Sequence, residues 1–373
     1  MKRFAPFYIW GLMLTLAITA FVLTEPALAV DQIPAVSAAP LLLAGFVNIR
    51  DLFTRDALIR YLVNLGPMPS TVVQDTIFVN RPQQSGPLIG EDVIKMVAKA
   101  MPLGRRGSRS ITVGGGTGAT NFYEPFPIHP DISVTGADLN NLKLIQGDQA
   151  SLAAWAQNKT AYLRNIVRAT TEAMCATALS GTLSWPVQLE GGGFETYSID
   201  FGDILTETPG VLWDNANAKL ADVFDLLQAM QLKLQMQGTG GTVEIWAGKT
   251  AYNALFKVAE KSTTTARIRV EITDQGINVG GFLIKRRAEL YYNPETKLYV
   301  PAVGDKVCKM IATDAGHMMP YAALDDLDSN LQPMPFFIKP IKTDNPSGYQ
   351  LVAESKPLPV VNVNGICDAT VTG

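Results

Sequence analysis

Residues 102–120 read PLGRRGSRSITVGGGTGAT, and they lie within a longer stretch, residues 81–129, that is rich in Gly, Pro, Arg and Ser. Loops longer than about 12–15 residues are uncommon in a self-contained domain. A stretch of roughly fifty residues therefore predicts an extended arm that finds its contacts on another chain. On this ground the sequence favours an assembly protein over an enzyme.

A run without proline, residues 147–183, follows and has the spacing of one long helix. Apolar side chains recur at steps compatible with a single helical face, namely Leu152, Trp155, Leu163, Ile166 and Met174. About thirty helical residues would span roughly 45 Å. Because a small core does not need that length, we expect this helix to act as a structural spine.

The composition is that of a nearly neutral protein with few charges. The chain has 373 residues, of which 47% are hydrophobic and 17% are charged, and its net charge is −3. This length predicts two lobes. A charged fraction below the usual ~25% indicates that much surface becomes buried between subunits, with a large monomer of apolar surface as the alternative. The net charge argues against a strongly basic nucleic-acid binder.

The residues that usually carry chemistry are sparse. Cys175, Cys308 and Cys367 are far apart and have no zinc-binding spacing, so we expect neither a disulfide framework nor a metal site. The two histidines, His129 and His317, stand near no recognisable nucleophile or metal motif. We therefore predict no enzyme activity, no cofactor and no metal.

The N-terminus has the pattern of a secretory signal. Lys2 and Arg3 precede an uncharged run, residues 4–23, and residues 27–29 form an A-x-A site before Val30. The apolar run is also long enough to span a bilayer, which leaves a membrane association open. Residues 1–45 could be a removed segment, a retained arm or the product of a misassigned start, and we favour a retained or non-secretory segment.

Shorter patterns predict the remaining elements. An amphipathic helix is expected over residues 51–65, with Asn48 or Asp51 as its cap, and residues 72–79 are expected to form a strand. Further helices are predicted over residues 91–100, 216–237 and 249–259, and strands over 186–201, 243–247, 267–272, 281–285, 289–292, 297–301, 351–353 and 360–363. This order of helices and strands is typical of an α+β protein.

Several short motifs, taken with the order of elements, carry a family resemblance. They are SRS at residues 108–110 through GGG at 114–116, FYEP at 122–125, YSIDFG at 197–202, EIWAGKTAY at 244–252 and AESKPLP at 353–359. In these features the chain resembles phage major capsid proteins of the HK97-type fold. More narrowly, it is similar to the lambda-type major capsid protein E family. The resemblance covers residues 46–373.

The resemblance implies a division of the chain into the parts of that fold. Residues 1–45 are a signal-like or extra N-terminal segment that precedes these parts. The parts are an N-arm with a short helix at 46–80, an E-loop at 81–130, a peripheral (P) domain with the spine helix at 131–215, an axial (A) domain at 216–332, and C-terminal strands at 333–373 that return to the P-domain. The E-loop, residues 81–130, is called the arm below.

The implied function is that of a structural head protein that self-assembles into hexamers and pentamers of an icosahedral shell around double-stranded DNA. Arg105, Arg106 and Arg109 are candidate contacts with carboxylates of a neighbouring subunit, with Glu91 and Asp92 as candidate partners; a solvated loop is the alternative. Other expected partners are a decoration protein, a portal and a scaffolding protein, and DNA held without sequence specificity. The expected location is the virion, assembled in the host cytoplasm.

Another class of protein remains open at this stage. The N-terminal pattern also fits an exported bacterial binding or surface protein whose signal peptide is cleaved. A secreted hydrolase is a weaker third possibility.

Overall fold

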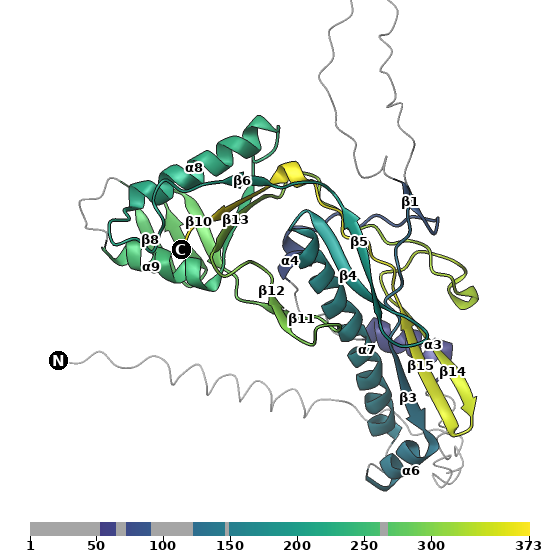
Figure 1. Cartoon of the computed structure of the whole chain (residues 1–373). Helices are drawn as coiled ribbons and strands as arrows, with labels where there is room; N and C mark the ends of the chain where they lie inside the picture. The colour runs from purple at the N-terminus through teal and green to yellow at the C-terminus, as the bar shows by residue number, and fades with distance from the viewer. Residues whose placement is uncertain (1–52, 65–71, 91–121, 146–148, 262–267) are drawn as a thin grey trace, which may run out of the picture. The chain divides into compact units, whose positions relative to one another are not determined.

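The computed structural model describes residues 53–64, 72–90, 122–145, 149–261 and 268–373 (Figure 1). The chain divides into two units, residues 1–47 and 48–373, and every described residue belongs to the second. The signal-like segment and the helix expected over residues 91–100 therefore lie outside the described residues. The described part contains helices and strands that alternate irregularly along the chain, which confirms the predicted α+β class.

Helix α7 (Gln149–Ala178) is the long helix that the apolar spacing predicted, and it has 30 residues. Its buried face includes Leu163, Val167 and Cys175. The helix ends before residue 183, because the chain turns at Gly181, whose φ is +92°. A Cβ atom at Gly181 would lie 2.5 Å from the carbonyl oxygen of Gly202, so glycine is required at this close approach.

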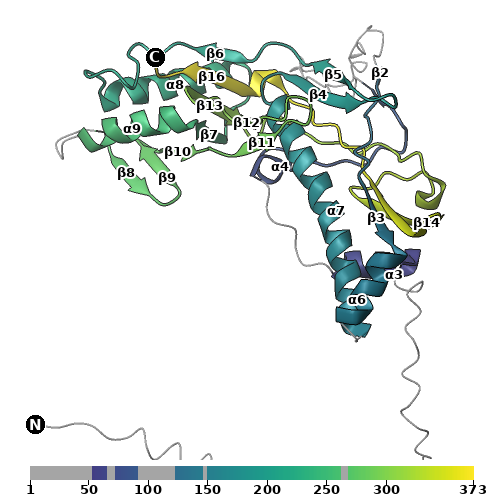
Figure 2. The ribbon, with the colours of Figure 1, turned by 60° about the horizontal axis from the view of Figure 1, so that its bottom comes forward.

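Two small sheets accompany α7 (Figure 2). One is a hairpin of β4 (Thr182–Gln188) and β5 (Phe194–Asp200), which replaces the end of the predicted helical run and extends the predicted strand region 186–201. The other has the strand order β14-β15-β3 and is fully antiparallel. Its strands are β14 (Phe337–Asp344), β15 (Ser347–Glu354) and β3 (Asp131–Thr135), and helix α6 (Gly136–Ile145) follows β3 directly.

Helix α3 (Arg55–Asn64) confirms the helix predicted near residues 51–65, with a later start. Thr54 caps it, since its hydroxyl oxygen accepts a hydrogen bond from the N–H of Ala57 at 3.2 Å. The caps expected at residues 48 and 51 lie outside the described residues. Phe53 packs against Trp155 of α7 and Tyr349 of β15, with ring centroids 6.1 and 5.3 Å away.

The strand predicted over residues 72–79 is wrong, because Val72–Thr76 forms the short helix α4. The local sequence, rich in β-branched residues, favours a strand. The helical form is stabilised by a long-range contact: the N–H groups of Val73 and Gln74 donate to the carboxylate of Glu172 on α7. A tertiary hydrogen bond thus overrides a local preference.

A mixed sheet of seven strands forms the second core, in the order β6-β16-β13-β7-β10-β9-β8. The strands are β6 (Leu205–Glu207), β16 (Ile366–Thr370), β13 (Val307–Ala312), β7 (Val243–Ala247), β10 (Phe282–Arg286), β9 (Gly276–Val279) and β8 (Val270–Thr273). Only the pairs β10–β7 and β16–β6 are parallel. The sequence predicted β7, β8 and β10 but not β6, β9, β13 or β16.

Helices α8 (Leu220–Met236) and α9 (Lys249–Lys261) confirm the two predicted helices and lie next to each other against this sheet (Figures 1 and 2). They share one apolar core with Ile245 of β7 and Met310 of β13. Trp246 points to the opposite face, where it joins a second core that contains Met174 and Leu179 at the end of α7. The strand β7 therefore lies between the two cores.

The C-terminal residues divide between the two regions. In the stretch 333–373, expected to return to residues 131–215, β14 and β15 pair with β3, whereas β16 pairs with β13 and β6. The strand predicted over residues 360–363 is wrong. Val360 forms only an isolated bridge to Met318, and a 3-10 turn at Val363–Gly365 leads into β16.

The packing of α8 predicts a clear contrast between two leucines of that helix. Leu227 is 0% exposed and Leu232 is 57% exposed. We expect Leu227→Ala to lower the free energy of unfolding by about 2–5 kcal/mol, because it leaves a cavity in the core. The matched control Leu232→Ala should change it by less than ~0.5 kcal/mol. Urea unfolding of the unassembled subunit measures both, and equal effects would contradict the described packing.

Candidate functional site

The five residues expected to contact a neighbouring subunit, Arg105, Arg106, Arg109, Glu91 and Asp92, lie outside the described residues. The structure does describe the residues on either side of segment 91–121, which we call the base of the arm. There β1 (Ile89–Gly90) pairs antiparallel with β2 (Phe122–Tyr123) (Figure 1). The residues that flank segment 91–121 are thus neighbours in a two-stranded ladder.

The outgoing limb of the arm runs beside a stretch of the C-terminal half. The N–H groups of Met319 and Tyr321 donate to the carbonyl oxygens of Asn80 and Pro82 at 2.8 and 2.9 Å. The N–H of Gln84 donates to the carbonyl oxygen of Tyr321 at 2.9 Å. These bonds hold the limb in strand-like register, and each adds about 0.5–1.5 kcal/mol to stability.

The returning limb is held by a different set of residues. Ile128 and Ser355 exchange two main-chain hydrogen bonds of 2.8 and 3.1 Å. The hydroxyl of Tyr197 on β5 donates to the carbonyl oxygen of Glu124 at 2.9 Å, and its ring meets that of Phe126 edge-on with centroids 4.9 Å apart. Burial, followed by the nearby Glu124 carboxylate, raises the pKa of Tyr197 to about 12, so the hydroxyl remains a donor at neutral pH.

Three separate elements meet at the buried carboxylate of Glu172, which is 3% exposed. It accepts hydrogen bonds from the N–H of Val73 at 2.7 Å, the N–H of Gln74 at 3.0 Å and the hydroxyl of Tyr291 at 3.1 Å. Tyr291 belongs to β11 (Leu290–Tyr292), which forms a hairpin with β12 (Tyr299–Pro301). Burial and the Glu172 charge raise the pKa of Tyr291 strongly, which keeps its hydroxyl protonated as a donor.

An ionic cluster beside this carboxylate ties the start of the arm to α7. The carboxylate of Asp75 contacts Arg81 at 2.8 Å and Arg168 of α7 at 2.7 Å. Arg81 also donates to the carbonyl oxygens of Phe78 and Gln74, at 2.9 and 2.7 Å. Because Arg81 is the first residue of the arm, the point at which the arm begins is fixed relative to the long helix.

Sequence reasoning did not identify this anchor. Glu172 is the only acidic residue of α7 and lies among buried residues such as Ala173 and Met174. A single carboxylate within the apolar face of a helix indicates a buried hydrogen-bond acceptor, which requires hydrogen-bond donors from elsewhere in the fold. Its partner Tyr291 is 119 positions away in the chain, so no local pattern connects them.

The described residues offer no catalytic arrangement. No group of three or more His, Cys, Asp or Glu side chains in them could hold a metal ion. His129 is exposed, and the three cysteines are buried, with burial raising the thiol pKa of each. Among the helices of the described ranges, none is both long and apolar enough to cross a membrane.

His317 is a buried neutral histidine next to the arm. Its Nδ1 accepts a hydrogen bond from the N–H of Asn362 at 3.2 Å, and its ring lies 6.3 Å from that of Phe78. Its Nε2 is buried and makes no hydrogen bond within the described part of the chain. Burial lowers the pKa of His317 to about 4. Its role is therefore packing, because a charged imidazolium does not fit this environment.

Comparison with solved structures identifies the fold. A protein assigned as the capsid protein of a prophage in Escherichia coli CFT073 superposes with a TM-score of 0.56 at 14% identity, covering 86% of this chain and 99% of that one. The described fold is thus the HK97-type capsid fold that the resemblance implied.

The chain belongs to a family described as phage major capsid protein E, whose family model matches residues 54–371. Weaker structural similarity is found to a Mycobacterium phage Che8 chain (13% identity, TM-score 0.42, covering 83% and 94%). The capsid of an empty GTA particle is also similar (10% identity, TM-score 0.44, covering 83% and 92%). No curated protein matches the chain.

Family membership settles the class of protein. The chain is a structural component of a phage capsid and hence of the virion, and it is not an enzyme, as the sequence predicted. The exported binding or surface protein that the N-terminal pattern suggested is not favoured.

The hydrogen bonds at Glu172 predict a graded loss of stability. We expect Glu172→Ala to lower the free energy of unfolding by about 3 kcal/mol, because two buried N–H groups and one hydroxyl lose their acceptor. Glu172→Gln retains one acceptor oxygen and should lose less. Glu195→Ala is the control, since Glu195 is exposed on β5. Urea unfolding of the unassembled subunit measures all three, and a Glu172→Ala variant as stable as the control would refute the anchor.

His317 predicts a loss of stability in acid. Its folded pKa of about 4 lies below the ordinary histidine value of 6.5, so the native state binds fewer protons between these values. The contribution is complete above pH ~6.5 and is lost as the pH falls towards 4, by about 3 kcal/mol in all. We expect His317→Gln to reduce the fall in unfolding free energy between pH 7 and 4.5.

The control for the pH experiment is His129→Gln, which changes the exposed histidine. The fall in unfolding free energy between pH 7 and 4.5 should be reduced more by His317→Gln than by His129→Gln. An unchanged pH dependence in His317→Gln would contradict the assignment to His317.

Proposed function

We propose that this chain self-assembles into hexamers and pentamers of an icosahedral shell that encloses double-stranded DNA, and that it does so in the host cytoplasm. The observation that carries the proposal is the anchored base of the arm in a member of a capsid-protein family. Both limbs are fixed to their own subunit, so segment 91–121 starts and ends at one defined place. This is what an element that reaches a neighbouring subunit needs.

In this proposal the arm contacts the adjacent subunit through its basic middle. Arg105, Arg106 and Arg109 pair with carboxylates of the neighbour, with Glu91 and Asp92 as the candidate partners. Exposed ion pairs contribute only about 0–1 kcal/mol each, so they mainly set the register of the contact. Burial of apolar surface supplies most of the association free energy.

The net charge of the chain supports a shell that encloses DNA without binding it tightly. A net charge of −3 provides few phosphate contacts, whereas a strongly basic lining would hold the genome through many of them. We therefore propose contact with DNA without sequence recognition. A portal, a scaffolding protein and a decoration protein are the further partners expected of such a shell, and the apolar segment 4–23 leaves membrane contact as a separate proposal.

Deletion of residues 102–120 tests the role of the arm. We expect the variant subunit to keep its unfolding free energy, because the base of the arm and both cores are untouched. It should form few or no particles. Size-exclusion chromatography and negative-stain electron microscopy measure assembly, and urea unfolding measures folding. Loss of folding would show that the arm serves its own subunit, and normal particles would show that assembly does not need it.

A second variant separates charge from length. Replacing Arg105, Arg106 and Arg109 by alanine should weaken assembly. Assembly of this variant should also be less sensitive to salt than assembly of the unmodified chain, because the ionic contacts are gone. Replacing Lys249, Lys257 and Lys261, which are exposed on α9, removes the same charge elsewhere and serves as the control. Equal effects of both triple replacements would point to net charge instead of a specific contact.

A further inference from the structure

The hairpin β11–β12 presents an exposed apolar surface. Five of its large side chains are between 48% and 66% exposed, namely Leu290, Tyr292, Leu298, Tyr299 and Val300. We call these five residues the hairpin patch. Within the ranges that the structure describes, β11 and β12 form a sheet of two strands that pairs with no other strand.

The size of the hairpin patch is that of an interaction surface. In the register of the hairpin, Leu290, Tyr292 and Tyr299 lie on one face, and Leu298 and Val300 lie on the other. The three side chains of the first face expose on the order of 300 Å², which is within the range of the largest apolar patch of a typical monomer, and such patches often mark interaction sites. One side of a standard protein interface is about 800 Å², so this face would form a substantial part of one. Tyrosine is also enriched in the energetically dominant positions of interfaces.

The hairpin is held rigid before any partner binds. The hydroxyl of Tyr291 is hydrogen-bonded to Glu172 at 3.1 Å. In the turn, the side-chain oxygen of Asn293 accepts hydrogen bonds from two main-chain N–H groups, at 2.9 and 3.1 Å. The rings of Tyr292 and Tyr299 already meet edge-on, with centroids 5.5 Å apart. Little conformational entropy is therefore lost when a partner covers the patch.

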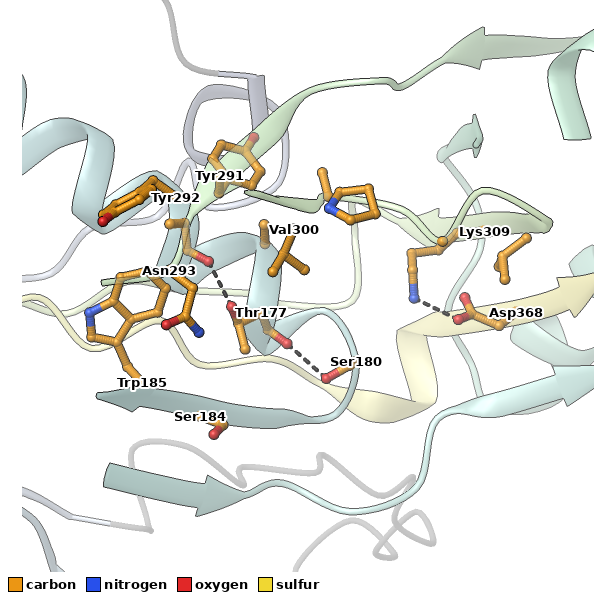
Figure 3. Close-up of a pocket in the computed structure, with 16 residues that line it drawn as sticks. Thr177, Ser180, Ser184, Trp185, Tyr291, Tyr292, Asn293, Val300, Lys309 and Asp368 are labelled. Carbon is orange, nitrogen blue, oxygen red and sulfur yellow. Dashed lines mark hydrogen bonds and ion pairs between the residues drawn. The ribbon is translucent and has the colours of Figure 1, made fainter. Parts of the chain in front are cut away.

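A hollow beside the patch gives it a place for an inserted side chain. This cavity of about 420 Å³ lies between the hairpin, α7 and β4. Figure 3 shows Tyr292 and Val300 of the hairpin lining it together with Trp185 of β4 and Thr177 of α7. Flat apolar surface next to a cavity is the arrangement in which a central anchor residue of a partner packs best.

The charges around the hollow indicate an uncharged protein surface as the occupant. Lys309 and Asp368 on its wall form an ion pair of 2.7 Å, so they neutralise each other (Figure 3). The turn of the hairpin carries one acid and one base, Glu295 and Lys297. Nucleic acid is bound through clusters of Lys and Arg that meet phosphates. A neutral aromatic surface matches the apolar surface of another folded subunit.

We propose that the hairpin patch is a contact surface covered by a second copy of this chain in the assembled shell. The proposal rests on the proposed function, because a subunit of a closed shell is surrounded by copies of itself. Contacts of this kind join unlike surfaces of neighbouring copies in rings. The hairpin patch supplies one of the two unlike surfaces, and the hollow receives a side chain of the neighbour.

Thiol labelling of the variant Tyr299→Cys tests this directly. Cys175, Cys308 and Cys367 are buried, so a fluorescent maleimide reports on the new thiol. We expect rapid labelling of the free subunit and several-fold slower labelling of assembled particles, with full labelling restored when the particles are dissociated. A second pair of variants tests the contribution to assembly: Tyr299→Lys should reduce the yield of particles severalfold, and Tyr299→Phe, which keeps the ring, should not.

Each other outcome overturns the inference. Equal labelling of particles and free subunits would show that no copy covers the patch. Protection already present in the free subunit would show that the chain covers its own hairpin. Normal particle yield from Tyr299→Lys, with a normal unfolding free energy, would show that the patch does not contribute to assembly. If the unmodified chain forms no particles, the proposed function fails, and this inference fails with it.

Discussion

The buried carboxylate of Glu172 is the constraint on which the arrangement of the subunit depends. A buried charge is costly unless hydrogen bonds satisfy it. The three donors that satisfy it come from α4 and from β11, so this requirement fixes two distant segments against α7. It makes Val72–Thr76 a helix, sets the point from which the arm departs, and holds the hairpin whose outer surface is exposed.

The same end of α7 is linked to the seven-stranded sheet. Lys309 of β13 is 5% exposed, and its ammonium group donates to the carbonyl oxygen of Leu179 at 3.0 Å as well as to Asp368 of β16. Trp246 of β7 packs into the core that contains Leu179. Helix α7 is therefore joined to the start of the arm through Arg168 and to the seven-stranded sheet at its C-terminal end. The proposed contact of the arm with a neighbouring subunit requires such a firm connection.

The sequence predicted the elements that carry their own periodicity. Helices α7, α8 and α9 repeat apolar residues at helical steps, and β7 is a short apolar run between turns, so local patterns suffice for them. Helix α6 was missed although Thr135 and Asp138 form a recognisable capping box, with hydrogen bonds of 2.7–3.2 Å between them. Strand β13 was missed because burial on both of its faces removes the alternation that marks a strand.

The anchor at the base of the arm could not be predicted in the same way. Glu172, Val73 and Tyr291 are brought together by the fold from three distant parts of the chain, and no spacing in the sequence records that. The arm itself is a prediction from length and composition, which require no knowledge of its partners, and residues 91–121 lie outside the described residues. The structure shows what holds the residues on either side of that segment.

Hydrogen–deuterium exchange on free subunits and on assembled particles tests the central claim most directly. The account predicts that the main-chain N–H groups of Val73, Gln74, Gln84 and Ile128 are protected already in the free subunit, while residues 91–121 gain protection only in particles. Protection of residues 91–121 in the free subunit, or no gain of protection on assembly, would contradict an arm whose base is fixed to its own subunit and whose middle binds a neighbouring subunit.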